Sequence, residues 1–147
     1  MSTLNAKQKR DALIGVWSLL SWHIDFADGR PARYPYGEFA VGNIVYSENG
    51  RMLATISESD RKPLSVAVPH QAPDVEKIAA FDSFFSYGGS FVVEGDEVVH
   101  RVDIALNPNF VGSEQRRHMH FESDFLTLSA HEGGRHHQLK WQRVAKA

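Results

Sequence analysis

The segment from residue 87 to residue 106 constrains the fold most strongly, because apolar and polar residues alternate along it on both sides of a short turn. Alternation with a period of two is typical of β-strands, and Gly95-Asp96 supplies the two-residue turn of a β-hairpin. If the two strands pair residue by residue from this turn, Phe91 faces His100. His100 then shares an otherwise apolar face with Val98, Val102, Ile104 and Leu106.

A third strand is predicted after the break at Asn107-Pro108-Asn109. Its inward face, by the same alternation, carries Met119, Phe121 and Arg117. Proline fixes φ near −65° and cannot enter the favoured type I′ turn, so we expect a wide connection between the strands. That connection would place Arg117 near Ile104, up to ~13 Å along the strands from His100 at ~3.3 Å per residue.

These inward polar residues have two interpretations. In the first, His100 is a hydrogen-bonded core histidine and Arg117 reaches the edge of the core, since most inward polar groups only satisfy structure. In the second, the two residues belong to a small-molecule site, which is typically apolar with a few convergent polar groups. The walls of such a site would be Tyr87, Phe91, Met119 and Phe121.

The rest of the chain predicts more strands of the same kind. Asn49-Gly50 marks a second hairpin, and residues 74–85 show helical spacing that predicts one inserted helix, acting as a plug or lid. We expect Asp11 to cap a short helical turn and the proline-bearing loop 30–39 to cross one mouth. With about eight strands in sequential hairpins, closure into an up-and-down barrel is favoured because it removes exposed edges. We therefore predict an all-β, eight-stranded antiparallel up-and-down barrel with one inserted helix, forming a single domain over residues 1–147.

Composition narrows the partners. The formal net charge is −2 with interspersed signs, which argues against nucleic acid as a partner. The chain has no cysteine and shows neither a secretory signal nor a window of the ~20 apolar residues that a membrane helix needs. We expect a cytoplasmic monomer or homodimer that binds a small molecule, with no membrane or nucleic-acid partner and no cofactor.

Several segments together resemble the lipocalin-like domain family of small bacterial and fungal proteins. They are LIGVWSLLSW, YPYGEFAVGNIVYSENGRM, AAFDSFFSYGGSFVVEGDEVVHRVD, NPNFVGSEQRRHMHFESDFLTLS and LKWQRV. The resemblance implies an eight-stranded barrel in which a late arginine, here Arg143, lies over the first-strand tryptophan, here Trp17, and an interior suited to a small apolar or aromatic compound. It also marks Tyr46, Tyr87, Gly89, His100 and Arg117 as positions of the family pattern, of which we take Tyr46 and Gly89 as further ligand-binding residues.

Two histidines on the third strand raise the alternative of a metal site. His118 and His120 lie on one face of the third strand, but alternation places both opposite Met119 and therefore outside. A functional zinc or iron site needs at least a third ligand with supporting contacts. Solvated surface histidines are the preferred interpretation, and no metal is predicted.

Two functions remain open from sequence. The first is binding of one small hydrophobic or aromatic molecule, a class that includes polyketide-like compounds, in the barrel cavity. The second is a cofactor-independent isomerase, cyclase or dehydratase in which His100 moves a proton and Arg117 or Tyr87 stabilises an oxyanion. A catalytic His100 should keep one ring nitrogen free, whereas a structural one should have both nitrogens engaged by protein.

Overall fold

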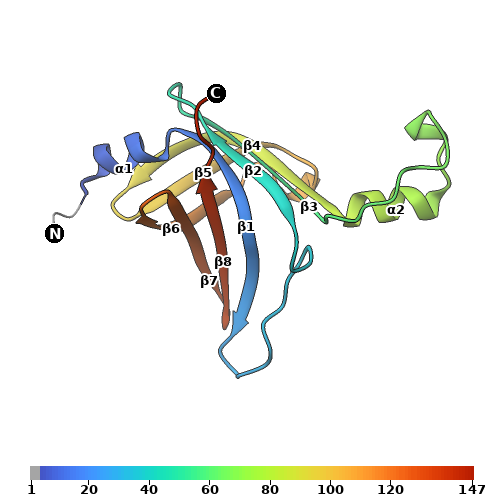
Figure 1. Ribbon diagram of the computed structural model, residues 1–147, viewed down its shortest axis with the longest axis horizontal. Coiled ribbons are helices and arrows are strands. Elements are labelled where there is room, and N and C mark those ends of the chain that lie inside the picture. Colours follow the sequence, from blue (N-terminus) through green and yellow to red (C-terminus); the bar gives the residue numbers. More distant parts are fainter. Residues whose placement is uncertain (1–3) are drawn as a thin grey trace.

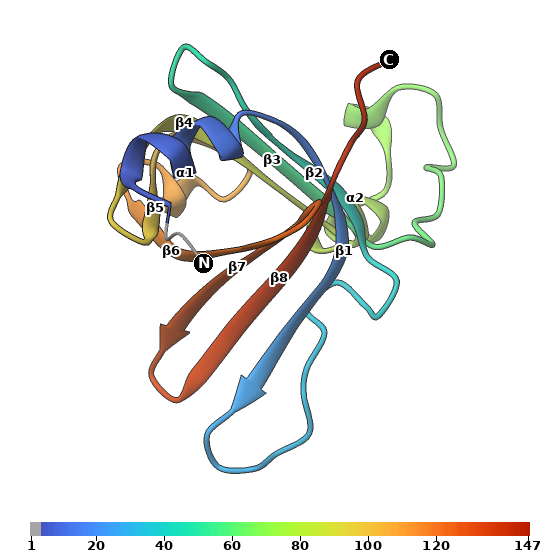
Figure 2. The same ribbon diagram turned by 60° about the vertical axis from the view of Figure 1, so that its left-hand side comes forward.

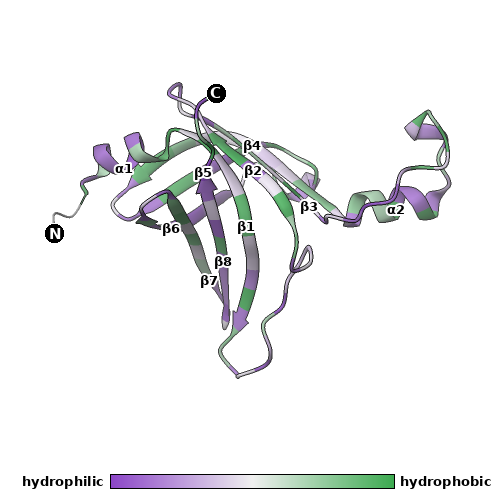
Figure 3. Cartoon of the chain, viewed as in Figure 1, coloured by the Kyte–Doolittle hydropathy of each residue, from purple (hydrophilic) through white to green (hydrophobic). Residues whose placement is uncertain are grey.

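The strands form one closed antiparallel barrel in which each strand pairs with the next and the last pairs with the first. The computed structural model describes residues 4–147. The strands are β1 (Gly15–Phe26), β2 (Val41–Tyr46), β3 (Arg51–Ser57), β4 (Phe84–Glu94), β5 (Glu97–Ala105), β6 (Glu114–Glu122), β7 (Phe125–Glu132) and β8 (Arg135–Arg143). Figure 1 shows them curving around a common interior, and in Figure 3 hydropathy changes repeatedly along strands such as β1. The predicted up-and-down barrel is confirmed.

The β4–β5 hairpin has the predicted register around its turn, with Glu94 opposite Glu97 and Phe91 opposite His100. Farther from the turn a β-bulge leaves Asp103 without a partner, since Gly88 pairs with Ile104 but Gly89 pairs with Val102. The prediction that Ile104 faces inward is therefore wrong, and its side chain is 61% exposed.

Gly89 has a structural reason to be glycine. A methyl group at this position would lie only 1.9 Å from the carbonyl oxygen of Arg101, so β4 and β5 approach each other there as only glycine allows. The bulge turns Ala105, in place of Ile104, toward Tyr87. Gly89 thus shapes the barrel wall at the bulge.

The pairing of β1 with β8 closes the sheet into a barrel, and Trp17 and Arg143 lie at one end of this seam. Trp17 is fully buried and is the register partner of Arg143, whose guanidinium lies 4.2 Å from the Trp17 ring centroid. The same guanidinium donates hydrogen bonds to the carbonyl oxygens of Ala12 and Ile14. The predicted contact between Trp17 and Arg143 is confirmed.

The helices differ in detail from the sequence-based predictions. Helix α1 (Ala6–Leu13) begins earlier than expected, because Asn5 and not Asp11 is its N-cap and forms a capping box with Gln8. Two 3₁₀ turns lie in the connections between elements: Pro69–Gln71 precedes α2 (Asp74–Asp82), and Pro108–Phe110 lies between β5 and β6. Within residues 4–147, no helix has the length and apolar character needed to cross a membrane.

Helix α2 (Asp74–Asp82) is shorter than the predicted helix, because residues 84 and 85 already belong to β4. It lies to one side of the barrel and has no buried residue, so it does not plug the barrel (Figure 1). Its apolar residues Val75, Ile78 and Phe81 are exposed. Helical spacing located this segment but could not show what it packs against.

The loop that follows β1 departs from the prediction that residues 30–39 cross one mouth of the barrel. Figure 2 shows it extending beyond the end of β1. It is held by backbone hydrogen bonds between Arg33 and Ile24 and by Tyr36, which stacks on Trp22 with ring centroids 5.3 Å apart. Only this tyrosine of the loop reaches the aromatic cluster of Trp22 and Phe85.

Replacing Trp17 by alanine should lower the free energy of unfolding by ~3–5 kcal/mol, the range for losing a buried aromatic side chain. Chemical denaturation measures the effect. Val16→Ala is the matched control, because Val16 is adjacent on β1 and partly exposed. Equal stability of the Trp17→Ala variant and wild type would contradict the role of this contact in closing the barrel.

Candidate functional site

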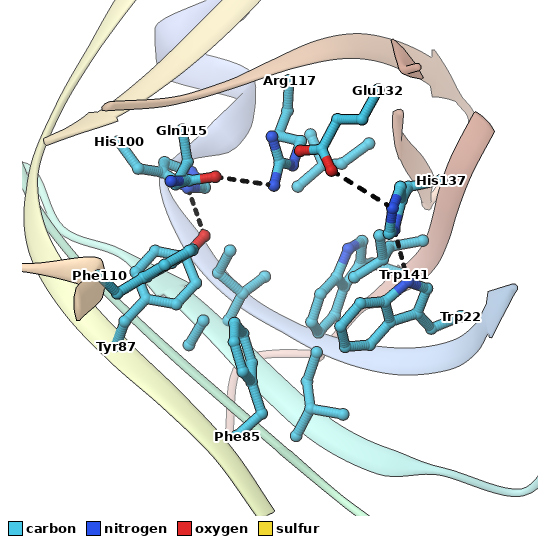
Figure 4. A pocket seen from close by; sticks show the side chains of 15 residues that line it. Trp22, Phe85, Tyr87, His100, Phe110, Gln115, Arg117, Glu132, His137 and Trp141 are labelled. Atoms are coloured by element: carbon cyan, nitrogen blue, oxygen red, sulfur yellow. Dashed lines mark hydrogen bonds and ion pairs between the residues drawn. The ribbon is translucent and has the colours of Figure 1, made fainter. Parts of the chain in front are cut away.

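A cavity of about 180 Å³ lies inside the barrel. Its outer edge includes Phe85, Phe110 and Glu132, which come from strand ends and a connection at the end of the barrel opposite α1. The lining is mostly apolar and aromatic, and Figure 4 shows how the side chains surround it. The residues that line it are Trp22, Ile44, Ala54, Ile56, Phe85, Tyr87, His100, Phe110, Gln115, Arg117, Leu128, Glu132, His137, Leu139 and Trp141.

His100 is held between two tyrosines in one wall of the cavity. Its Nε2 lies 2.7 Å from the hydroxyl oxygen of Tyr46, and its Nδ1 lies 2.6 Å from that of Tyr87. The imidazole is 1% exposed, as predicted for an inward residue. Both ring nitrogens are therefore engaged by protein, which is the arrangement expected of a structural or orienting histidine.

All three groups of this cluster are neutral at physiological pH. Burial, with a smaller contribution from the nearby Arg117 cation, lowers the pKa of His100 to about 3. Burial raises the pKa of Tyr87 to about 12, against an opposing effect of Arg117, and raises the pKa of Tyr46 well above its usual value. The cluster can direct hydrogen bonds, but its imidazole does not titrate near neutral pH.

Arg117 lies closer to His100 than the sequence-based register implied. Arg117 is opposite Val98, and Gln115 is opposite His100, so the prediction that Arg117 lies near Ile104 is wrong. The connection is wide, as expected, but the ladder between β5 and β6 ends at Arg101 while β5 continues to pair with β4. The last residues of β5, after Arg101, therefore have no partner in the β5–β6 ladder, and Arg117 pairs with Val98 instead of a residue nearer the end of β5.

The Arg117 guanidinium is partly anchored by its neighbours. It donates one hydrogen bond to the carbonyl oxygen of Arg116 (2.9 Å) and one to Oε1 of Gln115 (3.2 Å). Gln115 is itself held by a bond from its Nε2 to Ser113. Across residues 4–147, no carboxylate oxygen lies within ion-pair distance of Arg117, and its charged group lines the cavity together with the carboxylate of Glu132.

The opposite wall is built around His137. The indole nitrogen of Trp22 donates to Nδ1 of His137 over 3.3 Å, and Nε2 of His137 lies 3.7 Å from a carboxylate oxygen of Glu132. Partial burial lowers the pKa of this imidazole. Both nitrogens of His137 thus have protein neighbours as well.

Trp141, four residues after His137 on β8, differs from His137 in its hydrogen bonding. Its side chain lines the cavity and is buried at 1% exposure. Its Nε1 is a buried side-chain polar atom without a hydrogen-bond partner anywhere in residues 4–147. Figure 4 shows the indole beside the open space that Arg117 and Tyr87 also border.

The sequence-predicted site residues fall into two groups. Tyr87, His100 and Arg117 line the cavity together. The other predicted positions lie behind or below it: Tyr46 supports His100, Phe91 packs edge-on against Tyr46 at 4.9 Å between ring centroids, Phe121 lies 6.5 Å from the ring of Trp17, and Met119 and Gly89 are buried in the barrel wall. None of these five is among the lining residues.

Several lining residues were missed from sequence. Trp22 faces inward because a bulge between Leu19 and Ser21 breaks the alternation of β1, and no spacing signal reveals it. Phe110 lies in a connection, where alternation gives no information. Trp141 follows the inward alternation of β8 through Leu139 and could have been found on that basis.

The paired histidines of β6 lie outside, as predicted. Both His118 and His120 are exposed, on the face opposite the buried Met119. Among residues 4–147, no group of three or more His, Cys, Asp and Glu side chains is arranged to hold a metal ion.

Comparison with known proteins gives the family. The family model described as "Lipocalin-like domain" matches residues 14–145, which include all of the barrel strands. The chain belongs to the lipocalin-like domain family. A crystal structure of an uncharacterized protein from Bacteroides eggerthii DSM 20697 is similar at 10% identity and a TM-score of 0.46, covering 90% of this chain and 99% of that chain. No curated protein matches the chain.

The buried His100 should make stability depend on pH in acid. Between the folded-state pKa of about 3 and the ordinary value of 6.5, the unfolded chain binds a proton that the folded chain does not, so stability falls as pH decreases, by up to about 1.4 kcal/mol per pH unit. Denaturation of a His100→Gln variant at several pH values should show a smaller slope than wild type. His120→Gln, which changes an exposed histidine, is the control and should keep the wild-type slope. Identical slopes for wild type and His100→Gln would show that His100 is not kept neutral by burial.

Proposed function

We propose that this protein binds one small apolar or aromatic molecule in the barrel cavity. The observation that carries the proposal is the cavity itself, about 180 Å³ in volume and walled by Trp22, Phe85, Tyr87, Phe110 and Trp141. An apolar cavity of roughly 150 Å³ in another protein binds benzene, so this volume suits a compound with a single ring. Aromatic walls with few polar groups are typical of such sites.

Membership of the lipocalin-like family supports a binding role, because the closed eight-stranded barrel is a shape that encloses one small ligand. The compound's identity, including the polyketide-like class that we considered from sequence, stays a prediction. The same is true of the cytoplasmic location, of a monomeric or homodimeric state and of the lack of a nucleic-acid partner.

We favour binding over the alternative of proton transfer by His100. A general base must reach the substrate proton within hydrogen-bond distance, directly or through one water, whereas both nitrogens of His100 are occupied by Tyr46 and Tyr87. Its low pKa also makes the imidazole a weak base at neutral pH. His100 is better suited to orienting Tyr87 than to moving a proton of the ligand.

Filling the cavity should abolish binding. Small single-ring compounds such as p-xylene should raise the melting temperature of the wild-type protein in proportion to their occupancy. In Ala54→Leu the added side chain would enter the cavity, because Ala54 is a buried lining residue, and the melting temperature should no longer respond to the ligand. Native mass spectrometry of the purified protein would identify any compound that co-purifies.

Thr55→Leu is the matched control for this experiment. Thr55 is the next residue of β3 and is exposed, so this variant should keep the wild-type response to p-xylene. If Ala54→Leu folded and still responded like wild type, the cavity would not be the binding site.

A further inference from the structure

The indole nitrogen of Trp141 is a buried donor with no protein acceptor. The chain has three tryptophans, and the other two indole N–H groups are satisfied: Trp17 donates to the carbonyl oxygen of Leu13 (2.9 Å) and Trp22 to His137 (3.3 Å). Trp141 has no such partner in the described chain, and because its side chain is only 1% exposed, bulk water cannot replace one. Leaving a buried donor unpaired is costly, so an acceptor is expected in the cavity that it lines.

A second donor follows from the direction of the hydrogen bonds around His100. The neutral imidazole has one donor and one acceptor nitrogen. If Tyr46 accepted from Nε2, the hydroxyl proton of Tyr46 would be stranded, because this side chain is 1% exposed and has no other partner among residues 4–147. Tyr46 is therefore assigned as the donor to Nε2, and Nδ1–H donates to Tyr87.

This assignment leaves the hydroxyl proton of Tyr87 free. Tyr87 borders the cavity, and its oxygen already accepts from His100, so its O–H can donate only to a group inside the cavity. Figure 4 shows the hydroxyl between His100 and the open space. His100 thus acts as a positioning residue that fixes the direction of the Tyr87 hydroxyl.

The remaining polar lining adds a third donor and little acceptor capacity. The Arg117 guanidinium lines the cavity, and Oε1 of Gln115 is already occupied by it. Glu132 is the only carboxylate among the lining residues, and it is exposed and lies against His137. The interior therefore presents mainly donors on an aromatic surface, and it does so beside a positive charge.

We propose that the ligand is a single-ring aromatic compound with a carbonyl or carboxylate oxygen, and that this oxygen accepts a hydrogen bond from Trp141 Nε1, with Tyr87 and Arg117 as the further donors. The inference rests on the proposed binding function and names the class of its ligand. The inference also assigns Trp141 as a specificity-determining residue. A tryptophan that only filled the barrel core would not need this role.

Three probes of nearly the same size separate the possibilities. Acetophenone has a carbonyl oxygen, α-methylstyrene has a methylene group in its place, and benzoate has a carboxylate. Calorimetric titration of the wild-type protein should show that acetophenone or benzoate binds about tenfold or more tightly than α-methylstyrene, the difference expected for one additional buried hydrogen bond. If benzoate is the tightest, the charge of Arg117 is part of recognition, and Arg117→Met should remove the advantage of benzoate over acetophenone.

The matched variants are Trp141→Phe and Trp22→Phe. Each removes one indole from the cavity wall, but only Trp141 has an N–H without a protein acceptor. Trp141→Phe should lower the preference for acetophenone over α-methylstyrene toward one, whereas Trp22→Phe should leave that ratio near the wild-type value. Tyr87→Phe should lower the ratio in the same direction as Trp141→Phe.

A measurement on the unmodified protein covers the case in which a variant does not fold. The indole N–H groups of the three tryptophans give separate ¹⁵N–¹H signals, and one of them, that of Trp141, should move downfield with acetophenone and less with α-methylstyrene. Equal affinity for these two probes in wild type would overturn the inference and leave the apolar binding function standing, with water as the partner of Trp141. If none of the three probes bound at millimolar concentration, the binding function would fail together with the inference.

Discussion

The pairing of the first strand with the last is the constraint on which the cavity depends. Trp17 and Arg143 hold this seam at one end, where the Arg143 side chain covers the indole and ties the backbone of residues 12 and 14 to β8. Farther along the same seam, β1 supplies Trp22 while β8 supplies His137 and Trp141. Two stretches more than 100 residues apart in the chain therefore form one wall, and the cavity exists only when they meet.

The cavity wall around His100 places a titratable side chain next to a positive charge. An imidazole and two phenols are buried beside the guanidinium of Arg117, and a second positive charge there would be strongly unfavourable. Burial keeps His100 neutral, and a neutral imidazole can connect Tyr46 to Tyr87 through one accepted and one donated hydrogen bond. The arrangement satisfies both ring nitrogens without charging the core, and it leaves the cation as the charged group facing that side of the cavity.

Much of this could be predicted from sequence, because β-sheet alternation carries the information directly. The hairpin at Gly95-Asp96, the inward position of His100 and the outward positions of the β6 histidines all follow from a period of two. The register of β6 could not be predicted in this way, since the sequence does not show at which residue β5 leaves its ladder with β6. Nor does helical spacing reveal that α2 would lie beside the barrel with its apolar residues exposed.

Two β-bulges explain why the inward residues of β1 and β5 were mispredicted, and both lie beside the cavity. In β1 the extra residue Leu20 shifts the alternation, so that Trp22 and not Ser21 turns inward as the partner of Leu139. In β5 the extra residue Asp103 brings Ala105 beside Tyr87 and leaves Ile104 on the outside. The first bulge adds an aromatic wall, and the second puts a small side chain where a large one would occupy space near the Tyr87 ring. Bulges re-aim side chains at sites of function in many sheets, and here strict alternation would give a barrel with fewer aromatic contacts for a ligand and less room for one.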